Sequence, residues 1–161
     1  MPRLLLVHHT PSPNLQAVLE AVREGVAMVE DVELVVRPAL SAGAADLLEA
    51  DGVLLGTPAN IGYMSGALKH FFDTVYYPCL EAKIGMPYGV YVHGQNDTTG
   101  AIHSIEKATT APRSPSGRSG PTVESRPVCF SVSALTAAPT MTRKTVVHSQ
   151  NMLIATPESE P

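Results

Sequence analysis

Polar residues crowd into HHTPSPN at residues 8–14, a stretch that directly follows an apolar run. Three of them, Thr10, Ser12 and Asn14, are spaced by two, so their side chains could direct hydrogen-bond donors at one ligand. A helical pattern starts directly after them, and the unpaired N–H groups and dipole of a helix N-terminus favour an anion. Neutral donors at such a place suit a phosphate monoester. The plainer alternative for this loop alone is an ordinary capped helix start.

Two other kinds of site are not predicted. The chain contains neither the G-x-x-x-x-G-K-[ST] sequence of P-loop NTPases nor a G-x-G-x-x-G dinucleotide fingerprint. A metal would need a third ligand beside His8 and His9, and only His93 is a plausible neighbour, with no carboxylate spaced to complete the set. The cysteines, Cys79 and Cys129, form no C-x-x-C pair. We therefore expect no metal.

Two further loops have the composition of ligand-binding segments. TPANIGYMSG, residues 57–66, combines apolar Ile61 and Met64 with polar groups, a mixture that suits a flat aromatic ligand with polar edges. The polar groups are those of Thr57, Asn60, Tyr63 and Ser65. HGQNDTTG, residues 93–100, is rich in Gly, Asn and Thr. Each loop alone could be an ordinary turn, because Gly, Asn and Asp are common in turns. Three such loops at one edge of one sheet are much harder to dismiss.

Apolar periodicity predicts the elements that position these loops. Buried strands are expected at residues 3–9, 32–39, 52–57 and 87–94. Helices are expected after an N-cap at Asn14, with an apolar face from Leu15 to Val26, and at 44–50. Two more are expected, one with an apolar stripe from Leu68 to Val75 and an end before Pro78, and one at 98–109.

Strands that alternate with helices imply a parallel sheet with helices on both faces. Right-handed crossovers leave few topologies. The expected fold class at this size is α/β, a flavodoxin-like doubly wound sheet with strand order 2-1-3-4-5. In such a sheet the ligand lies outside the carboxyl ends of the strands, where the order reverses between strands 1 and 3. The three loops follow strands 1, 3 and 4 and therefore share that edge.

Composition limits the class of protein. A chain of 161 residues suits one domain, and its net charge of −4 argues against a general nucleic-acid binder, which needs a basic face. Its apolar runs are all shorter than the roughly 18 residues that span a membrane, and the N-terminal run is too short for a secretion signal. Two cysteines without metal or redox spacing fit a reduced, cytoplasmic setting.

The last part of the chain differs from the rest. Residues 1–110 carry 6 Lys and Arg against 12 Asp and Glu, whereas residues 111–161 carry 5 against 3 and hold half of the 14 prolines. Such a composition buries little apolar surface, and only residues 127–135 alternate well enough for a strand. We expect a folded but incomplete domain at 1–110 and an atypical Pro/Ser/Arg-rich tail, disordered or translated in a shifted frame. A divergent, ordered C-terminus that keeps a fifth strand is the alternative.

Three segments together resemble the flavodoxin-like NAD(P)H-dependent FMN reductases and quinone oxidoreductases, of the tryptophan-repressor-binding-protein type. The segments are HHTPSPN, LLGTPANIGYMSGALKHFFDTVYYPC and PYGVYVHGQNDTTGA, within residues 3–110. The resemblance implies FMN as cofactor, NAD(P)H as co-substrate, and hydride transfer to a small flavin or quinone acceptor. It implies no catalytic side chain, because the flavin carries the redox chemistry. It also implies self-association as a dimer or tetramer, and a fifth strand and closing helix that the tail pattern does not provide.

The resemblance further implies which residues contact FMN. The phosphate would be held by Thr10, Ser12, Asn14 and Leu15. The isoalloxazine ring would lie along Pro58, Ala59, Asn60, Ile61, Gly62 and Tyr63. Its other side would be bordered by His93, Gly94, Gln95 and Asn96. Pro11 and Pro13 depart from the pattern, because each removes an N–H donor from the phosphate loop. A flavodoxin-type electron carrier without reductase turnover and a non-catalytic flavodoxin-like interaction module are the alternatives.

Overall fold

A single sheet forms the centre of the molecule. The computed structural model describes residues 1–95, 97–109 and 144–151, the last range as backbone only. The sheet order is β2-β1-β3-β5-β6, with β4 paired to β3. The strands are β1 (Arg3–His8), β2 (Glu33–Pro38), β3 (Gly52–Asn60), β4 (Tyr63–Met64), β5 (Pro87–Gly94) and β6 (Lys144–Asn151). The β1–β2, β1–β3 and β3–β5 pairs are parallel, which confirms the predicted flavodoxin-like order for the first four predicted strands.

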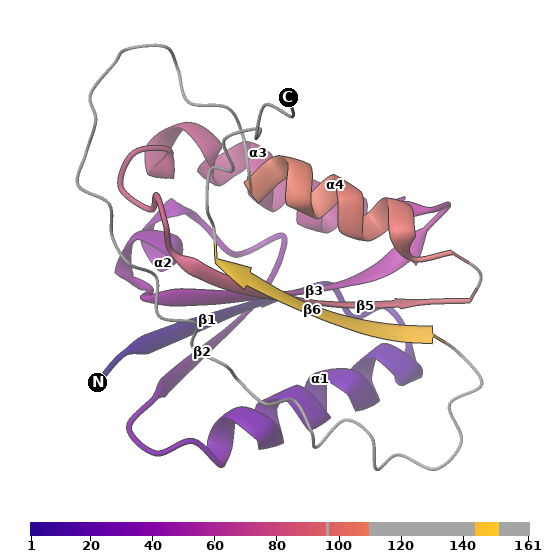
Figure 1. Cartoon of the computed structure of the whole chain (residues 1–161), viewed down its shortest axis with the longest axis horizontal. Helices are drawn as coiled ribbons and strands as arrows, with labels where there is room; N and C mark the ends of the chain where they lie inside the picture. Colours follow the sequence, from indigo (N-terminus) through magenta and orange to yellow (C-terminus); the bar gives the residue numbers. More distant parts are fainter. Residues whose placement is uncertain (96, 110–143, 152–161) are drawn as a thin grey trace, which may run out of the picture.

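Helices cover both faces of the sheet (Figure 1). The helices are α1 (Pro13–Ala27), α2 (Ala44–Glu49), α3 (Gly66–Cys79) and α4 (Thr99–Thr109). Among these, α1 lies on one face and α2, α3 and α4 lie on the other (Figure 1). Leu15, Val18 and Leu19 of α1 pack with Leu6 and Tyr91 on the first face, and a larger apolar cluster centred on Phe71 and Leu68 fills the second. Because both faces of the sheet are covered, side chains on either side of a strand are buried, which is why the strands read as continuous apolar runs.

Two helix ends differ from the prediction. Helix α1 has Ser12, not Asn14, as its N-cap, because Pro13 takes the first helical position, where a missing N–H costs nothing. Helix α3 does not stop before Pro78 but runs through it to Cys79. A proline in the last turn removes only one helical hydrogen bond, and buried Val75 and Cys79 hold this turn against the core.

The segment after β3 and the tail also differ from the prediction. Strand β3 continues to Asn60 and turns back into β4, where a loop was expected. In the tail, Lys144–Asn151 form β6, antiparallel to β5, a strand that the alternation pattern did not predict. An edge strand is fixed by backbone pairing with its neighbour, so its side-chain pattern is a weak signal. The strand predicted at 127–135 lies outside the described residues.

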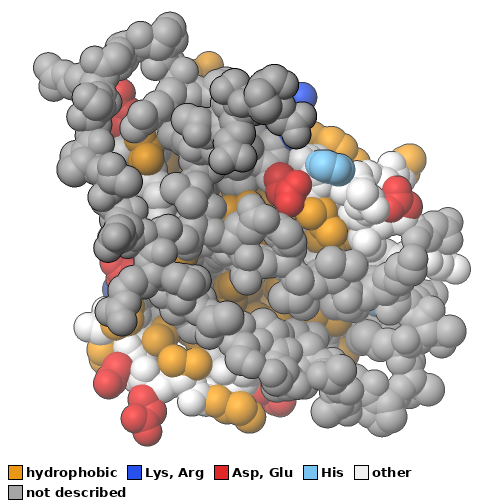
Figure 2. Space-filling view, viewed as in Figure 1, with side chains coloured by type: hydrophobic (Ala, Val, Ile, Leu, Met, Phe, Trp, Pro, Cys, Tyr) orange, Lys and Arg blue, Asp and Glu red, His pale blue; other side chains and the backbone are white. Residues whose placement is uncertain are grey.

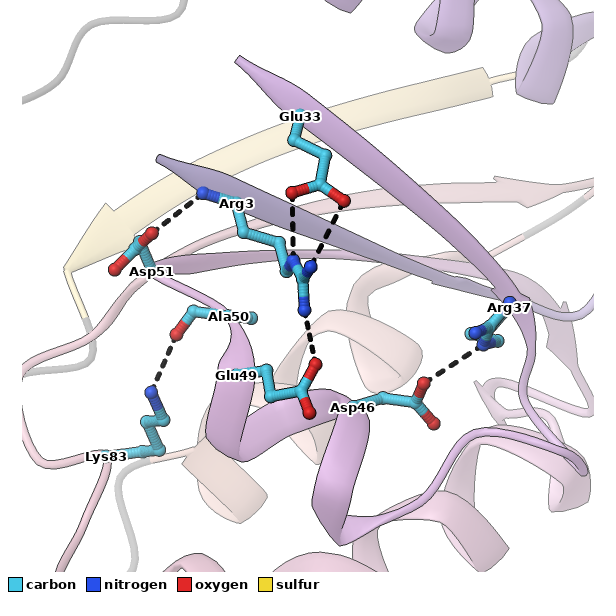
Figure 3. Close-up of polar contacts among 8 residues, drawn as sticks. All are labelled: Arg3, Glu33, Arg37, Asp46, Glu49, Ala50, Asp51 and Lys83. Carbon is cyan, nitrogen blue, oxygen red and sulfur yellow. Dashed lines mark hydrogen bonds and ion pairs between the residues drawn. The ribbon is translucent and has the colours of Figure 1, made fainter. Parts of the chain in front are cut away.

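Ion pairs tie the amino ends of the strands together (Figure 3). The Arg3 guanidinium at the start of β1 contacts Glu33 of β2 through Nε at 3.1 Å, and it also contacts Glu49 of α2. The Arg3 backbone N–H donates to Asp51 Oδ2 at 2.7 Å, just before β3. The Lys83 ammonium donates to the Ala50 carbonyl at 2.7 Å. These contacts fix β1, β2, α2 and the start of β3 at the edge opposite the three loops.

Acidic and hydrophobic side chains are both visible on the described surface, in the view of Figure 2. Within residues 1–95, 97–109 and 144–151, no helix is both long enough and apolar enough to cross a membrane. In the same residues, no group of His, Cys, Asp and Glu side chains is arranged to hold a metal ion.

Candidate functional site at the carboxyl end of the sheet

The structure brings the three predicted loops to one edge. They follow β1, β3 and β5, which are neighbours in the sheet. The backbone N–H of His9 donates to the Gly56 carbonyl at 2.9 Å and joins the first loop to the end of β3. On the other side, β5 stays paired with β3 up to Pro58 and His93. The three loops therefore surround the point where the strand order reverses, which is the expected ligand position in this kind of sheet.

The first loop places its polar groups at the start of α1. Thr10 Oγ1 lies 2.8 Å from His8 Nδ1, and the Ser12 hydroxyl oxygen accepts from the Leu15 N–H at 3.3 Å. Because Ser12 accepts through its oxygen, its hydroxyl proton stays available for a ligand. Asn14 is exposed on the first helical turn, whereas the Leu15 side chain is buried in the core, so only the Leu15 backbone faces this end. The loop has the neutral donors that a phosphate monoester needs.

The second loop is a tight hairpin with a strained tip. Asn60 pairs with Tyr63, and the two residues between them have positive φ, 50° at Ile61 and 70° at Gly62. This is the conformation of a type I′ turn, which favours Asn-Gly. A β-branched residue there is an outlier, and strain of this kind tends to occur at functional sites. Ile61 is fully exposed, so no packing of its own side chain explains it.

Two buried hydroxyls fix the base of the hairpin. Thr57 donates to the Pro58 carbonyl and accepts from the Ser65 N–H, both at 2.9 Å. Ser65 in turn accepts from the Leu68 N–H at 3.2 Å and caps α3. Both side chains are fully buried. Thr57 and Ser65, which looked from the sequence like polar groups facing a ligand, instead hold the hairpin in place.

Close glycine contacts fix the hairpin against the third loop and α4. A Cβ on Gly94 would lie 2.8 Å from Ala59 Cβ, and a Cβ on Gly100 would lie 2.1 Å from the Gly62 carbonyl oxygen. The Met64 N–H also donates to the Ser104 hydroxyl of α4 at 3.4 Å. The backbone of the hairpin therefore rests directly on the first turn of α4.

The remaining predicted residues lie at the mouth of the site. Pro58 and His93 are buried where β3 and β5 end, while Asn60 and Gln95 are exposed. Tyr63 is half-exposed beside Ile61. Asn96 lies outside the described residues. The described members of the predicted set thus belong to one edge of the sheet, although the Leu15 side chain lies in the core and Ala59 packs against it.

Sequence reasoning missed the floor of the site. The Tyr91 ring lies over Gly56, so close that a Cβ on Gly56 would be 2.1 Å from the phenol oxygen. Tyr91 is 2% exposed, burial raises the pKa of its hydroxyl, and among the described residues this hydroxyl has no hydrogen-bond partner. The Nδ1 atom of His9 is also buried and has no hydrogen-bond partner among the described residues. A glycine inside an apolar strand is the signal that could have pointed to this close approach.

The sequence model of the NADPH-dependent FMN reductase family matches residues 19–113, more than half of the chain. The chain belongs to that family. The matched range includes the hairpin and the third loop but begins after the first loop, so the reductase family match does not itself cover Thr10, Ser12 and Asn14.

The curated relatives of this chain include a flavodoxin and a quinone-type dehydrogenase. A flavodoxin of Aquifex aeolicus is 35% identical over 75 residues, 47% of this chain and 40% of that protein. An NAD(P)H dehydrogenase (quinone) of Acidithiobacillus ferrooxidans is 27% identical over 125 residues, 62% of each. The chain therefore spans less than two thirds of either relative.

Solved structures agree with the fold. The two-electron reduced flavodoxin of Megasphaera elsdenii superposes with a TM-score of 0.54 at 18% identity, over 65% of this chain and 74% of that one. A short-chain flavodoxin associated with a bacterial microcompartment superposes with the same TM-score at 19% identity, over 67% and 74%. At such identities the likeness confirms the flavodoxin-like architecture alone.

Proposed function

We propose that this chain binds FMN at the carboxyl end of its sheet and transfers reducing equivalents from NAD(P)H to a flavin or quinone acceptor. The observation that carries the proposal is the meeting of the three loops at the β1/β3 switch point, in a chain of the FMN reductase family. When bound, the flavin supplies the redox chemistry, and the protein supplies binding, orientation and electrostatics.

The residues at this edge fit such a group. Thr10 and Ser12 offer hydroxyls and the start of α1 offers its dipole, a combination that suits a phosphate without a lysine. The hairpin from Pro58 to Tyr63 and the segment from His93 to Gln95 form the two sides of the mouth, where a flat ring would lie. Ile61 at the exposed tip provides an apolar surface for one face of that ring.

The chain's own residues would also limit access of water. Pro58 and His93 are buried near the ends of β3 and β5, and Gly94 lets the β5 backbone approach the hairpin closely. No side chain is proposed as a nucleophile or general base. The protein's role in the reaction would be to hold the flavin through the phosphate loop, the hairpin and the segment from His93 to Gln95, where the flavin would supply the redox chemistry.

Flavin titration tests the binding half of the proposal. Purified protein should quench the fluorescence of added FMN and shift its visible absorption bands. Steady-state oxidation of NADPH and NADH, with FMN or a benzoquinone as acceptor, tests the reductase half. Binding without turnover on any of these acceptors would contradict the reductase assignment.

An electron carrier is the second candidate function, and the flavodoxin relatives favour it specifically. A carrier would bind FMN, show essentially no NAD(P)H oxidation alone, and accept electrons from a separate reductase. A folded chain that binds no flavin would instead favour the non-catalytic interaction module. The same two measurements therefore separate all three functions.

A further inference from the structure

The His8 side chain is bonded to the loop where a phosphate is proposed to bind. Its Nδ1 atom lies 2.8 Å from Thr10 Oγ1, a good hydrogen-bond distance. The bond can run in either direction. When Nδ1 carries no proton, the Thr10 hydroxyl donates to it, and Thr10 then has no proton for a ligand. When Nδ1 carries a proton, in the neutral Nδ1–H tautomer or in the charged ring, it donates to Thr10, and the hydroxyl proton is free to bind an anion.

The surroundings of His8 disfavour its charged form in the ligand-free protein. Burial lowers the pKa of His8, and the nearby positive charges of His9 and Arg23 lower it further. His8 alternates with Leu6 and so shares the α1 face of the sheet with Tyr91 and His93 of β5. Its register neighbours on β2 and β3, Pro38 and Gly56, carry no charge. Neither register neighbour supplies a carboxylate to hold a proton on His8, and the α1 residue that acts on it, Arg23, is positively charged and paired with Glu20.

A phosphate dianion would reverse this balance. Residues 8–14 contain neither Lys nor Arg, so His8 and His9 are the only groups of that stretch that can acquire a positive charge. An added anion on the Thr10 side favours the protonated ring, because opposite charges at short distance favour the charged form. The charged ring always carries a proton on Nδ1, so it leaves the Thr10 hydroxyl proton free to donate to the phosphate. Charge and hydrogen bonding therefore act in the same direction.

We propose that His8 is a positioning residue for the phosphate of the flavin, neutral in the free protein and protonated when the phosphate is bound, so that binding takes up a proton. The proposal rests on the proposed function. It concerns the phosphate group only and makes no claim about the flavin ring.

The sign of the pH dependence follows directly. If the pKa of His8 is higher in the complex than in the free protein, FMN affinity is greatest below the pKa of the free protein, falls as pH rises between the two pKa values, and levels off above the pKa of the complex. One proton taken up corresponds to a change of up to about tenfold in the dissociation constant per pH unit. Riboflavin, which lacks the phosphate, should show no such dependence.

Fluorescence quenching at several pH values between about 6.5 and 8.5 tests the linkage, because the phosphate of FMN is largely dianionic there. Dissociation constants would be measured for FMN and riboflavin with the wild type and with His8→Asn. Asparagine keeps a donor toward Thr10 but cannot titrate. His70→Asn, on the exposed side of α3, is the matched control.

We expect the wild type and His70→Asn to bind FMN roughly threefold or more weakly at the top of this range than at the bottom, with riboflavin binding unchanged. His8→Asn should bind FMN with a flat pH profile, because asparagine does not titrate. The riboflavin comparison needs no variant, so it stands even if His8→Asn fails to fold.

The outcomes separate this inference from the proposed function. A wild type that binds FMN with a flat profile overturns the His8 inference and leaves FMN binding intact. The His8 inference is also overturned if His8→Asn keeps the pH dependence of FMN affinity, or if riboflavin binding shows the same pH dependence. A wild type that binds neither flavin overturns the proposed function and the inference together.

Discussion

The two ends of the sheet are built in opposite ways. At the amino end, the Arg3 guanidinium and backbone N–H have acidic partners on β2, on α2 and before β3, and the Lys83 ammonium is bonded to a backbone carbonyl. At the carboxyl end, Ile61 is strained and exposed, and the Tyr91 hydroxyl is buried without a partner among the described residues.

This difference indicates what each end is for. An end whose only role is structural gains stability when its charged groups have partners, as the Arg3 guanidinium does. An end that binds a ligand keeps hydrogen-bond donors without partners and keeps backbone strain. Both lower the stability of the ligand-free protein. Mutations at the amino end should therefore only weaken the fold, whereas some mutations at the carboxyl end should strengthen it.

The largest effect is expected for Gly100→Ala. The new Cβ would meet the Gly62 carbonyl at 2.1 Å, a backbone contact that cannot be relieved by a side-chain rotation. We expect a loss of about 2 kcal/mol or more in the free energy of unfolding, measured in urea, together with loss of FMN binding. Gly66→Ala is the control, because its Cβ would meet nothing within 4 Å. Equal stability of the two variants would show that the hairpin does not rest on α4.

Tyr91→Phe should raise the free energy of unfolding of the ligand-free protein. Removing a buried hydroxyl that has no partner recovers about 1 kcal/mol, since its desolvation is no longer uncompensated. Tyr77→Phe, at an exposed tyrosine of α3, should change stability by less than about 0.5 kcal/mol. If Tyr91→Phe is instead destabilising, the hydroxyl has a hydrogen-bond partner in solution. The two ends of the sheet would then not differ in this unsatisfied polar group.

Ile61→Asn should also stabilise the ligand-free protein, by about 0.5 to 1 kcal/mol, because asparagine tolerates the positive φ of the turn. The isoleucine is fully exposed, so the substitution removes no core packing. Leu40→Asn, at another exposed apolar residue, is the control for the loss of surface hydrophobicity. Thermal unfolding of both variants measures the difference. A lower midpoint for Ile61→Asn than for Leu40→Asn would show that the positive φ of Ile61 does not destabilise the protein.

The smallest effect is expected at the amino end, for Arg3→Gln. The substitution removes the contacts to Glu33 and Glu49, and it should lower the unfolding midpoint by less than Gly100→Ala does. The gap to the wild type should shrink in high salt, because exposed ion pairs are screened. FMN affinity should not change. A salt-independent gap, or a change in flavin binding, would show that the two ends are not independent.

Local patterns made much of this fold predictable. The bounds of β5 were predicted without error, and those of β1, β2, α2 and α4 to within a residue at either end. Buried parallel strands are continuous apolar runs, and both the runs and the turn residues after them are visible in a few consecutive letters. The positions of the three loops followed, because parallel strands put their carboxyl ends at one edge.

Contacts between distant residues were decided only by the tertiary structure. The sequence shows Thr57 and Ser65 as free polar groups, and only the folded hairpin reveals that the Thr57 hydroxyl accepts from the Ser65 N–H while the Ser65 hydroxyl caps α3. The placement of Tyr91 over Gly56 depends on the register of β5 on β3, and the pairing of β6 depends on an edge left open by β5. The sequence by itself determined which segments are strands, helices and loops, because those choices depend on near neighbours. Only the folded chain decided which hydrogen-bond donors have partners within the protein and which remain for a ligand, because those partners are fixed by register across the sheet.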